Sequence, residues 1–199
     1  MVRLYILLFI VVFALGLSYF LPVVTHIEIK NNSHFSDQEI RELAHIDFGT
    51  PYLWINDWWL RELKNEPWIA TASVIKQWPN TILISVVERQ GFLTDGNNVY
   101  ASDGTLLPSA KTDSEHLIRF SGWGRSRLVE LINLINLLEL QKLEPKMVSY
   151  NPAGFTIQFA NSRLFTPSIE ALRTHWTSIK QQSGSRVYVY PWGVSAVHE

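Results

Sequence analysis

Residues 66–89 are the segment that most constrains the fold of this chain. They contain two runs of alternating apolar residues, separated by Pro79 and Asn80. An apolar period of two is typical of a strand that buries one face. Proline fixes φ and lacks an amide hydrogen, and asparagine tolerates turn geometry, so a chain reversal is expected there. The segment therefore predicts a β-hairpin whose apolar face needs a cover. The side chains expected on that face are Ala70, Ala72, Val74, Ile82, Ile84 and Val86.

The composition limits the class of protein. The chain has 199 residues, of which 47% are apolar, 17 are basic and 18 are acidic. Such a balanced charge gives no support to nucleic-acid binding, which depends on a basic surface. The chain has no cysteine, and this excludes disulfides and thiolate chemistry. The length suits one membrane segment and one or two small domains.

Residues 4–22 are predicted to form a single transmembrane helix. Residues 4–21 are apolar except for Gly16 and Ser18, and a helix of this length is about 27 Å long, close to the hydrocarbon thickness of a bilayer. The preceding basic residue predicts a very short cytoplasmic tail, residues 1–3, and export of the remainder. A cleaved signal peptide is the alternative, because Ala14-Leu15-Gly16 resembles a small-x-small cleavage site.

Residues 23–92 are predicted to be the first exported domain. Residues 26–30 alternate like a short strand, and Ser36 and Glu39 form a capping box, which predicts that a helix begins between them. A second helix is expected to end before Pro67. The predicted order is strand, helix, helix, strand and strand. Two helices would then cover the apolar face of a three-stranded sheet.

This order and its hairpin resemble the POTRA domain of the FtsQ/DivIB family of bacterial division proteins. The family pattern is Pro-Trp-Val, alternating alanine and valine, a basic residue, a proline, an apolar strand and Glu-Arg. The matching residues here are Pro67, Trp68, Ile69, Ala72, Val74, Lys76, Pro79, Ile82, Ile84, Val86, Glu88 and Arg89. Two positions depart from the pattern. Lys76 stands where the family usually has arginine, and Gln90-Gly91 replaces the proline that usually follows Glu-Arg.

Residues 93–199 are predicted to form a second, β-rich domain with two helices packed on an antiparallel sheet, so that the whole chain is of the α+β class. Asp103-Gly104 predicts a hairpin over residues 98–107, which resembles the opening of the family's second domain. Helical spacing predicts one helix over residues 127–142 and a second that follows Thr166. A further hairpin is expected around residues 151–154.

Residues 186–197 predict a terminal strand that is apolar on both faces. A terminal strand is often an edge strand, and an exposed edge of this composition can bind a partner by strand addition. A strand paired on both sides and buried is the alternative. The family resemblance implies that FtsB- and FtsL-like partners dock on this strand. The implied site consists of Val187, Tyr188, Val189, Tyr190, Trp192, Gly193 and Val194.

A second partner contact is predicted at the tip of the first hairpin, formed by Lys76, Gln77, Trp78 and Pro79. Of the adjacent Trp58 and Trp59, one is expected to face the core and the other is left open.

The remaining motifs predict no catalytic residue, cofactor or metal site. Ser73-Val74-Ile75-Lys76 fits the Ser-x-x-Lys pattern of penicillin-binding enzymes, but that serine is required at the start of a helix, and Ser73 is expected within a strand. The six histidines show no ligand spacing. An enzyme is therefore not expected.

The resemblance implies a non-enzymatic scaffold protein of the divisome. It would lie as a single-pass protein in the inner membrane at the division septum, with its bulk in the periplasm. There it would link early and late division proteins and control septal peptidoglycan synthesis indirectly. FtsK-, FtsW- and FtsI-like proteins are further implied partners, alongside the lipid bilayer, with no nucleic acid or small-molecule substrate. The alternatives are a POTRA protein for polypeptide transport or outer-membrane assembly, and a cell-wall enzyme.

Overall fold

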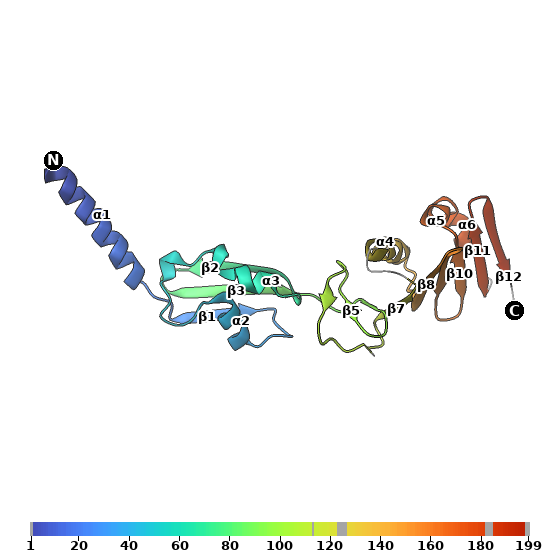
Figure 1. Cartoon of the computed structure of the whole chain (residues 1–199), viewed down its shortest axis with the longest axis horizontal. Helices are drawn as coiled ribbons and strands as arrows, with labels where there is room; N and C mark the ends of the chain where they lie inside the picture. Colours follow the sequence, from blue (N-terminus) through green and yellow to red (C-terminus); the bar gives the residue numbers. More distant parts are fainter. Residues whose placement is uncertain (1, 113, 123–126, 182–184, 198–199) are drawn as a thin grey trace. The chain divides into compact units, whose positions relative to one another are not determined.

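The computed structural model describes residues 2–112, 114–122, 127–181 and 185–197 (Figure 1). The chain divides into two compact units, Met1–Arg89 and Gln90–Glu199. Each unit has its own buried apolar core, so each is described by itself.

Helix α1 (Val2–Phe20) opens the first unit, and its large apolar side chains are exposed. A transmembrane helix was expected over residues 4–22, but the structure does not support that expectation. Within the part of the chain that is described, no helix is both long and apolar enough to cross a membrane.

The rest of the first unit is a three-stranded sheet with helices on one face (Figure 1). The strands lie in the order β1-β3-β2, with β1 parallel and β2 antiparallel to β3. The elements are β1 (His26–Lys30), α2 (Asp37–Ala44), the 3-10 helices η1 (Tyr52–Trp54) and η2 (Asp57–Leu60), α3 (Arg61–Asn65), β2 (Ile69–Gln77) and β3 (Thr81–Glu88). The predicted order is confirmed, except that the second helix is divided into η2 and α3.

The predicted capping box explains why α2 begins where it does. The Glu39 amide donates to Ser36 Oγ over 3.3 Å, and the Ser36 amide donates to the Glu39 carboxylate over 2.8 Å. Two amides at the start of the helix are thereby satisfied. In the second predicted helix, Trp59 packs against the core and Trp58 is exposed, as expected for adjacent helical positions.

One residue of the predicted apolar face lies on the other side of the hairpin. Ala70 is exposed, whereas Ile69 and Ala72 are buried. The pairing register of β2 with β3 shifts between Ile69 and Thr71. An extra residue in one strand changes which side chains face inward, so strict alternation placed Ala70 on the wrong face.

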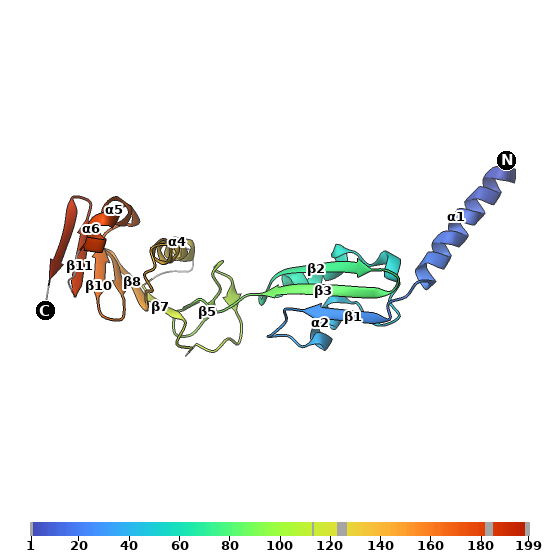
Figure 2. The ribbon, with the colours of Figure 1, turned by 180° about the vertical axis from the view of Figure 1, so that it is seen from behind.

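The second unit is built on one sheet with the strand order β12-β11-β10-β9-β8-β7-β4-β5-β6 (Figure 2). Its strands are β4 (Leu93–Thr94), β5 (Val99–Tyr100), β6 (Leu106–Leu107), β7 (Ile118–Ser121), β8 (Met147–Asn151), β9 (Gly154–Gln158), β10 (Arg163–Thr166), β11 (Arg186–Tyr190) and β12 (Gly193–Val197). Its helices are α4 (Leu128–Glu139), α5 (Ile169–Thr174) and α6 (Trp176–Gln181). The β5–β6 hairpin around Gly104, with φ of +84°, and the β8–β9 hairpin confirm their predictions.

The sheet of the second unit is mixed, which corrects the prediction of an antiparallel sheet. Strands β7 and β8 are parallel, and so are β10 and β11. A helix follows the first strand of each pair, α4 in one case and α5 with α6 in the other. A crossover of this kind returns the chain in its original direction. The last predicted helix is also interrupted, at His175.

All three helices pack on the same face of this sheet. The buried side chains below them include Val148 of β8, Ile157 of β9, Leu164 of β10 and Val187 of β11. These residues are cross-strand partners of one another, so they form one apolar row. The opposite face of the sheet lacks helices among the residues that the structure describes, and it is called the open face below.

Candidate partner-binding site

The predicted terminal strand is in fact a hairpin, because Pro191 and Trp192 form a turn between β11 and β12. A proline cannot donate to a sheet, so a strand is readily interrupted there. The imidazole nitrogen Nε2 of His175 lies 3.0 Å from the Pro191 carbonyl oxygen, which ties α5 and the turn together. The expectation of one continuous strand was therefore wrong, and the two halves of the segment have different environments.

Strand β11 lies between β10 and β12, so both of its backbone edges are paired. Val187 and Val189 are buried beneath the helices, whereas Tyr188 and Tyr190 are half-buried on the open face. The buried alternative considered for this segment thus describes β11. A partner can reach the tyrosine rings but not the backbone of β11.

Strand β12 carries the free edge of the sheet. Among the described residues no strand pairs with its outer side, and its sequence Gly-Val-Ser-Ala-Val has neither charge nor proline. Charged side chains and proline are features that proteins use to protect an edge strand. Because β12 has neither, it is open to strand addition. Gly193 and Val194 belong to this strand, and Val194 packs partly against the core. The opposite edge strand, β6, is only 2 residues long.

An aromatic row lies on the open face next to this edge. The rings of Tyr190 and Trp192 stack with centroids 5.0 Å apart, and Trp192 is 81% exposed. Phe165 of β10 lies 6.3 Å from Tyr188 and 6.1 Å from Tyr190, centroid to centroid. Sequence reasoning missed Phe165. Because Leu164 and Phe165 are adjacent in a strand, they face opposite sides of the sheet, and this was the available signal that Phe165 is not in the core. The position of Phe165 beside β11, however, depends on a long-range strand pairing.

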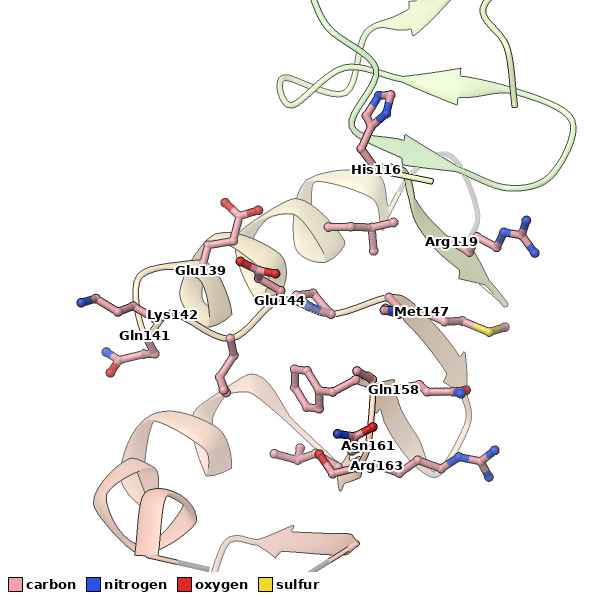
Figure 3. Close-up of a pocket in the computed structure, with 18 of the residues that line it drawn as sticks. His116, Arg119, Glu139, Gln141, Lys142, Glu144, Met147, Gln158, Asn161 and Arg163 are labelled. Atoms are coloured by element: carbon pink, nitrogen blue, oxygen red, sulfur yellow. The ribbon is translucent and has the colours of Figure 1, made fainter. Parts of the chain in front are cut away.

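A basic row crosses the same face. Arg119, Met147, Gln158, Arg163 and Arg186 are successive cross-strand partners on β7, β8, β9, β10 and β11. All five are exposed, and none is acidic. Figure 3 shows the first four side chains extending to the same side of the sheet. Aromatic and arginine side chains are enriched at protein interfaces, so the two rows together form a surface suited to a partner with acidic and apolar groups.

The second predicted contact lies at the β2–β3 turn. Lys76, Gln77, Trp78 and Pro79 are all exposed there, and Trp78 is 75% exposed. Lys76 Nζ donates to the Leu53 carbonyl oxygen over 2.8 Å. The four residues lie in unit 1, whereas the terminal hairpin lies in unit 2.

Glu88 at the end of β3 and the following Arg89 both form hydrogen bonds within unit 1. The Glu88 carboxylate accepts hydrogen bonds from the amides of Ser33, His34 and Phe35 and from Ser33 Oγ. Burial raises the pKa of Glu88, but these hydrogen bonds outweigh it and leave that pKa below its ordinary value. The pair therefore stabilises the loop between β1 and α2 and does not form a binding site.

Arg89 fixes the start of the hairpin in a similar way. Its guanidinium donates to the Pro67 and Ile69 carbonyl oxygens, and its amide donates to the Trp68 carbonyl oxygen. The Trp68 ring stacks on His34, with centroids 3.8 Å apart. The motif residues thus connect the first and last residues of the hairpin to each other and to the loop before α2.

A cleft of about 1480 Å³ opens in the second unit between the end of α4, the β9–β10 turn and α6 (Figure 3). Apolar residues such as Phe159 and Ile179 line part of it. In Figure 3, Arg119 and Arg163 point to the opposite side from Glu139 and Lys142, so these charges do not converge. The cleft therefore shows no arrangement of an acid, a base and a nucleophile around one point.

The Ser-x-x-Lys motif and the acidic and histidine side chains form neither a catalytic nor a metal site among the described residues. Ser73 lies within β2 opposite Ser85, as predicted, and not at the start of a helix. In the part of the chain that is described, no three His, Asp or Glu side chains are placed to hold a metal ion. Neither observation points to catalysis.

Comparison with known families identifies the first unit. Residues 23–89 match the family described as the FtsQ-type POTRA domain, and no curated protein matches the chain. The chain is thus a POTRA-domain protein, and domains of this class are generally non-catalytic scaffolds. The match covers 67 of the 199 residues, and its FtsQ type supports an assignment to the FtsQ/DivIB family of division proteins.

Proposed function

We propose that this protein is a scaffold of the bacterial divisome, which binds partner proteins through the open face and the β12 edge of its second unit. The observation that carries this proposal is the combination at one place of an unprotected edge strand, a stacked aromatic row and a row of arginines. The family assignment supports a role in division, and the geometry supports recruitment by noncovalent contact.

The partner proposed for this site is an FtsB- or FtsL-like protein. Its docking segment adds a strand to β12 and carries apolar groups for the rings of Tyr188, Tyr190 and Trp192. Acidic groups of the same segment face the arginine row, because complementary charge sets orientation and speeds association. Val187 and Val189 act only as support beneath the surface, since they are buried. FtsK-, FtsW- and FtsI-like proteins are further proposed partners.

The proposal includes a location and a mode of action. The protein acts at the division septum on the outer side of the inner membrane, and it influences septal peptidoglycan synthesis through its partners, without an enzymatic step of its own. Attachment to the lipid bilayer is through α1. The exposed apolar side chains of α1, from 45% for Val11 to 71% for Phe20, support this attachment, because a soluble surface rarely keeps so large an apolar area uncovered.

A binding experiment with a matched control tests the proposal. The double variant Tyr190→Ala/Trp192→Ala of the full chain should bind the extracytoplasmic segment of an FtsB-like partner at least about 100-fold more weakly, since interface hot spots contribute about 2 kcal/mol or more each. The control Val129→Ala removes a 68% exposed side chain from α4 and should leave the dissociation constant unchanged. Both variants should retain the wild-type circular dichroism spectrum. Wild-type affinity in the double variant would refute the site.

A further inference from the structure

Exposed apolar side chains gather at one end of the first unit. Leu53 and Trp54 lie in η1 and are 45% and 46% exposed, and Trp78 lies at the β2–β3 turn. These three residues are called the tip surface. A surface so rich in tryptophan is uncommon without something to cover it.

The tip surface is held together by contacts between η1 and the hairpin. The buried Tyr52 ring meets the Trp78 ring edge-on, with centroids 6.1 Å apart. The Lys76 ammonium group lies 5.7 Å from the Tyr52 ring centroid, in addition to its hydrogen bond to Leu53. Although η1 and the turn are more than 20 residues apart in sequence, they form one surface of fixed geometry.

The apolar helix α1 ends next to this surface. The Tyr52 amide donates to the Pro22 carbonyl oxygen and the Thr25 amide donates to the Asn80 carbonyl oxygen, each over 3.0 Å. Val23 forms a β-bridge with Pro51. These bonds leave no free linker between the end of α1 and the hairpin turn, and the Tyr19 ring lies 6.4 Å from the Trp54 ring.

We infer that the tip surface lies in the headgroup region of the lipid bilayer to which α1 attaches. This inference rests on the proposed attachment of α1. Tryptophan is enriched at membrane–water interfaces because its ring is apolar while its N–H seeks a polar partner. Lysine can keep its ammonium group among lipid phosphates while its stem lies along apolar surface. The residues Lys76 to Pro79 are thereby assigned to a lipid contact, in place of the protein contact predicted from the sequence.

The absence of cysteine from the sequence makes a direct test possible. Single cysteines are introduced into the full chain at Gln77, Val87 and Val12 and labelled with an environment-sensitive fluorophore. The protein is reconstituted into vesicles of phosphatidylcholine and phosphatidylglycerol, either without a quencher or with a lipid that carries a nitroxide at headgroup depth or within the acyl chains. Gln77 precedes Trp78 in the sequence, and its replacement by cysteine leaves the aromatic side chains of the tip surface unchanged. Val87 is 53% exposed and lies at the other end of the same hairpin, opposite Thr71.

The Gln77→Cys label should be quenched at least about twofold more than the Val87→Cys label. Adding Trp54→Ser and Trp78→Ser to the Gln77→Cys chain should bring its quenching down to that of the Val87→Cys label. Equal quenching at positions 77 and 87 in the wild-type background, with the Val12→Cys label quenched, would overturn this inference alone and return the tip to a protein contact. Absence of quenching at Val12, in the middle of α1, by both the headgroup and the acyl-chain nitroxide would overturn both the proposed attachment and this inference.

Discussion

Two hairpins, β2–β3 and β11–β12, differ in what their polar and aromatic side chains contact. In β2–β3, the terminal Glu88 and Arg89 are bound to the backbone of their own unit. In β11–β12, Trp192 and the outer edge of β12 have no such cover among the described residues. At the end opposite its turn, the hairpin with the more distinctive sequence is therefore the more self-contained one. A strong sequence motif here marks a folding unit, and the weaker sequence marks the proposed binding site.

The largest effect is expected from a substitution that removes internal contacts of the first hairpin. Glu88→Ala leaves three backbone amides and a hydroxyl without their carboxylate, and bonds to a charged acceptor contribute about 1.5–3 kcal/mol. We expect a loss of about 3 kcal/mol in the stability of unit 1 and faster amide exchange at Ser33, His34 and Phe35. Hydrogen-exchange mass spectrometry measures both. Glu28→Gln, in a solvent-exposed ion pair with Lys30, is the control and should change stability by less than about 0.5 kcal/mol.

Acid should weaken the same contact by a smaller amount, because protonation leaves the side chain in place. The hydrogen bonds hold the folded-state pKa of Glu88 below its ordinary value. Its contribution to stability is therefore complete above the unfolded pKa of about 4.3 and is lost as the pH falls through the lower folded value. Unfolding of unit 1 by urea at pH 7 and at stepwise lower pH should show this slope, and Glu88→Gln should reduce it. An unchanged slope in that variant would assign the acid sensitivity to other carboxylates.

In the second hairpin, a charge on the edge should weaken binding without unfolding the unit. Ser195 is exposed on β12, so Ser195→Lys places a charge beside the free edge, as natural edge strands do. We expect about 10-fold weaker partner binding, or about 1.4 kcal/mol, with the thermal midpoint preserved. Ser73→Lys, on the edge strand β2 of unit 1, serves as the matched control and should leave partner affinity unchanged. A similar loss in both variants would mean that β12 has no special role.

The basic row should affect the rate of association more than the lifetime of the complex. Arg163→Glu reverses one charge in the middle of the row, and we expect about fivefold slower association at low salt, with a smaller effect on dissociation. Surface plasmon resonance at 50 and 300 mM salt would measure this. The effect should fade at the higher salt concentration, because exposed charges are screened. Arg61→Glu, on α3 in unit 1, is the control for net charge.

The smallest effect is expected at the Ser-x-x-Lys motif. Ser73→Ala removes an exposed hydroxyl from the middle of β2, so stability should change by no more than about 0.5 kcal/mol and partner affinity not at all. Covalent labelling of the wild-type chain by a fluorescent penicillin should also be absent. Labelling that disappears in the Ser73→Ala variant would establish the nucleophile that the strand context argues against.

The parts of the fold that the sequence predicted correctly depend on neighbouring residues. Ser36 and Glu39 start α2 through contacts across one helical turn, and Gly104 reverses the chain within a few residues. The alternation of Ile82, Ile84 and Val86 placed β3 correctly because β3 is regular throughout. In each case the cause and the effect lie within one element.

The errors and omissions arise where distant segments meet. The bulge beside Ile69 is a property of the pairing with β3, and periodicity within β2 does not reveal it. Phe165 and Arg163 join the candidate site only because a crossover brings β10 beside β11. Pro191 is a residue at which a strand can be interrupted, but the apolar residues on either side of it suggested one strand. Sequence reasoning therefore found part of the binding surface and missed the rows that run across the sheet.

The parallel pairing of β1 with β3 has a mechanical consequence. The chain enters β1 beside the hairpin turn, where His26 pairs with Thr81, and it leaves β3 at Glu88, at the opposite end. Tension applied between the two ends of this unit pulls β1 and β3 in opposite directions along their length. The hydrogen bonds between them are then loaded together in shear and cannot open one at a time from an end. The POTRA domain is thus built to transmit a pulling force along the chain without unfolding at the first bond.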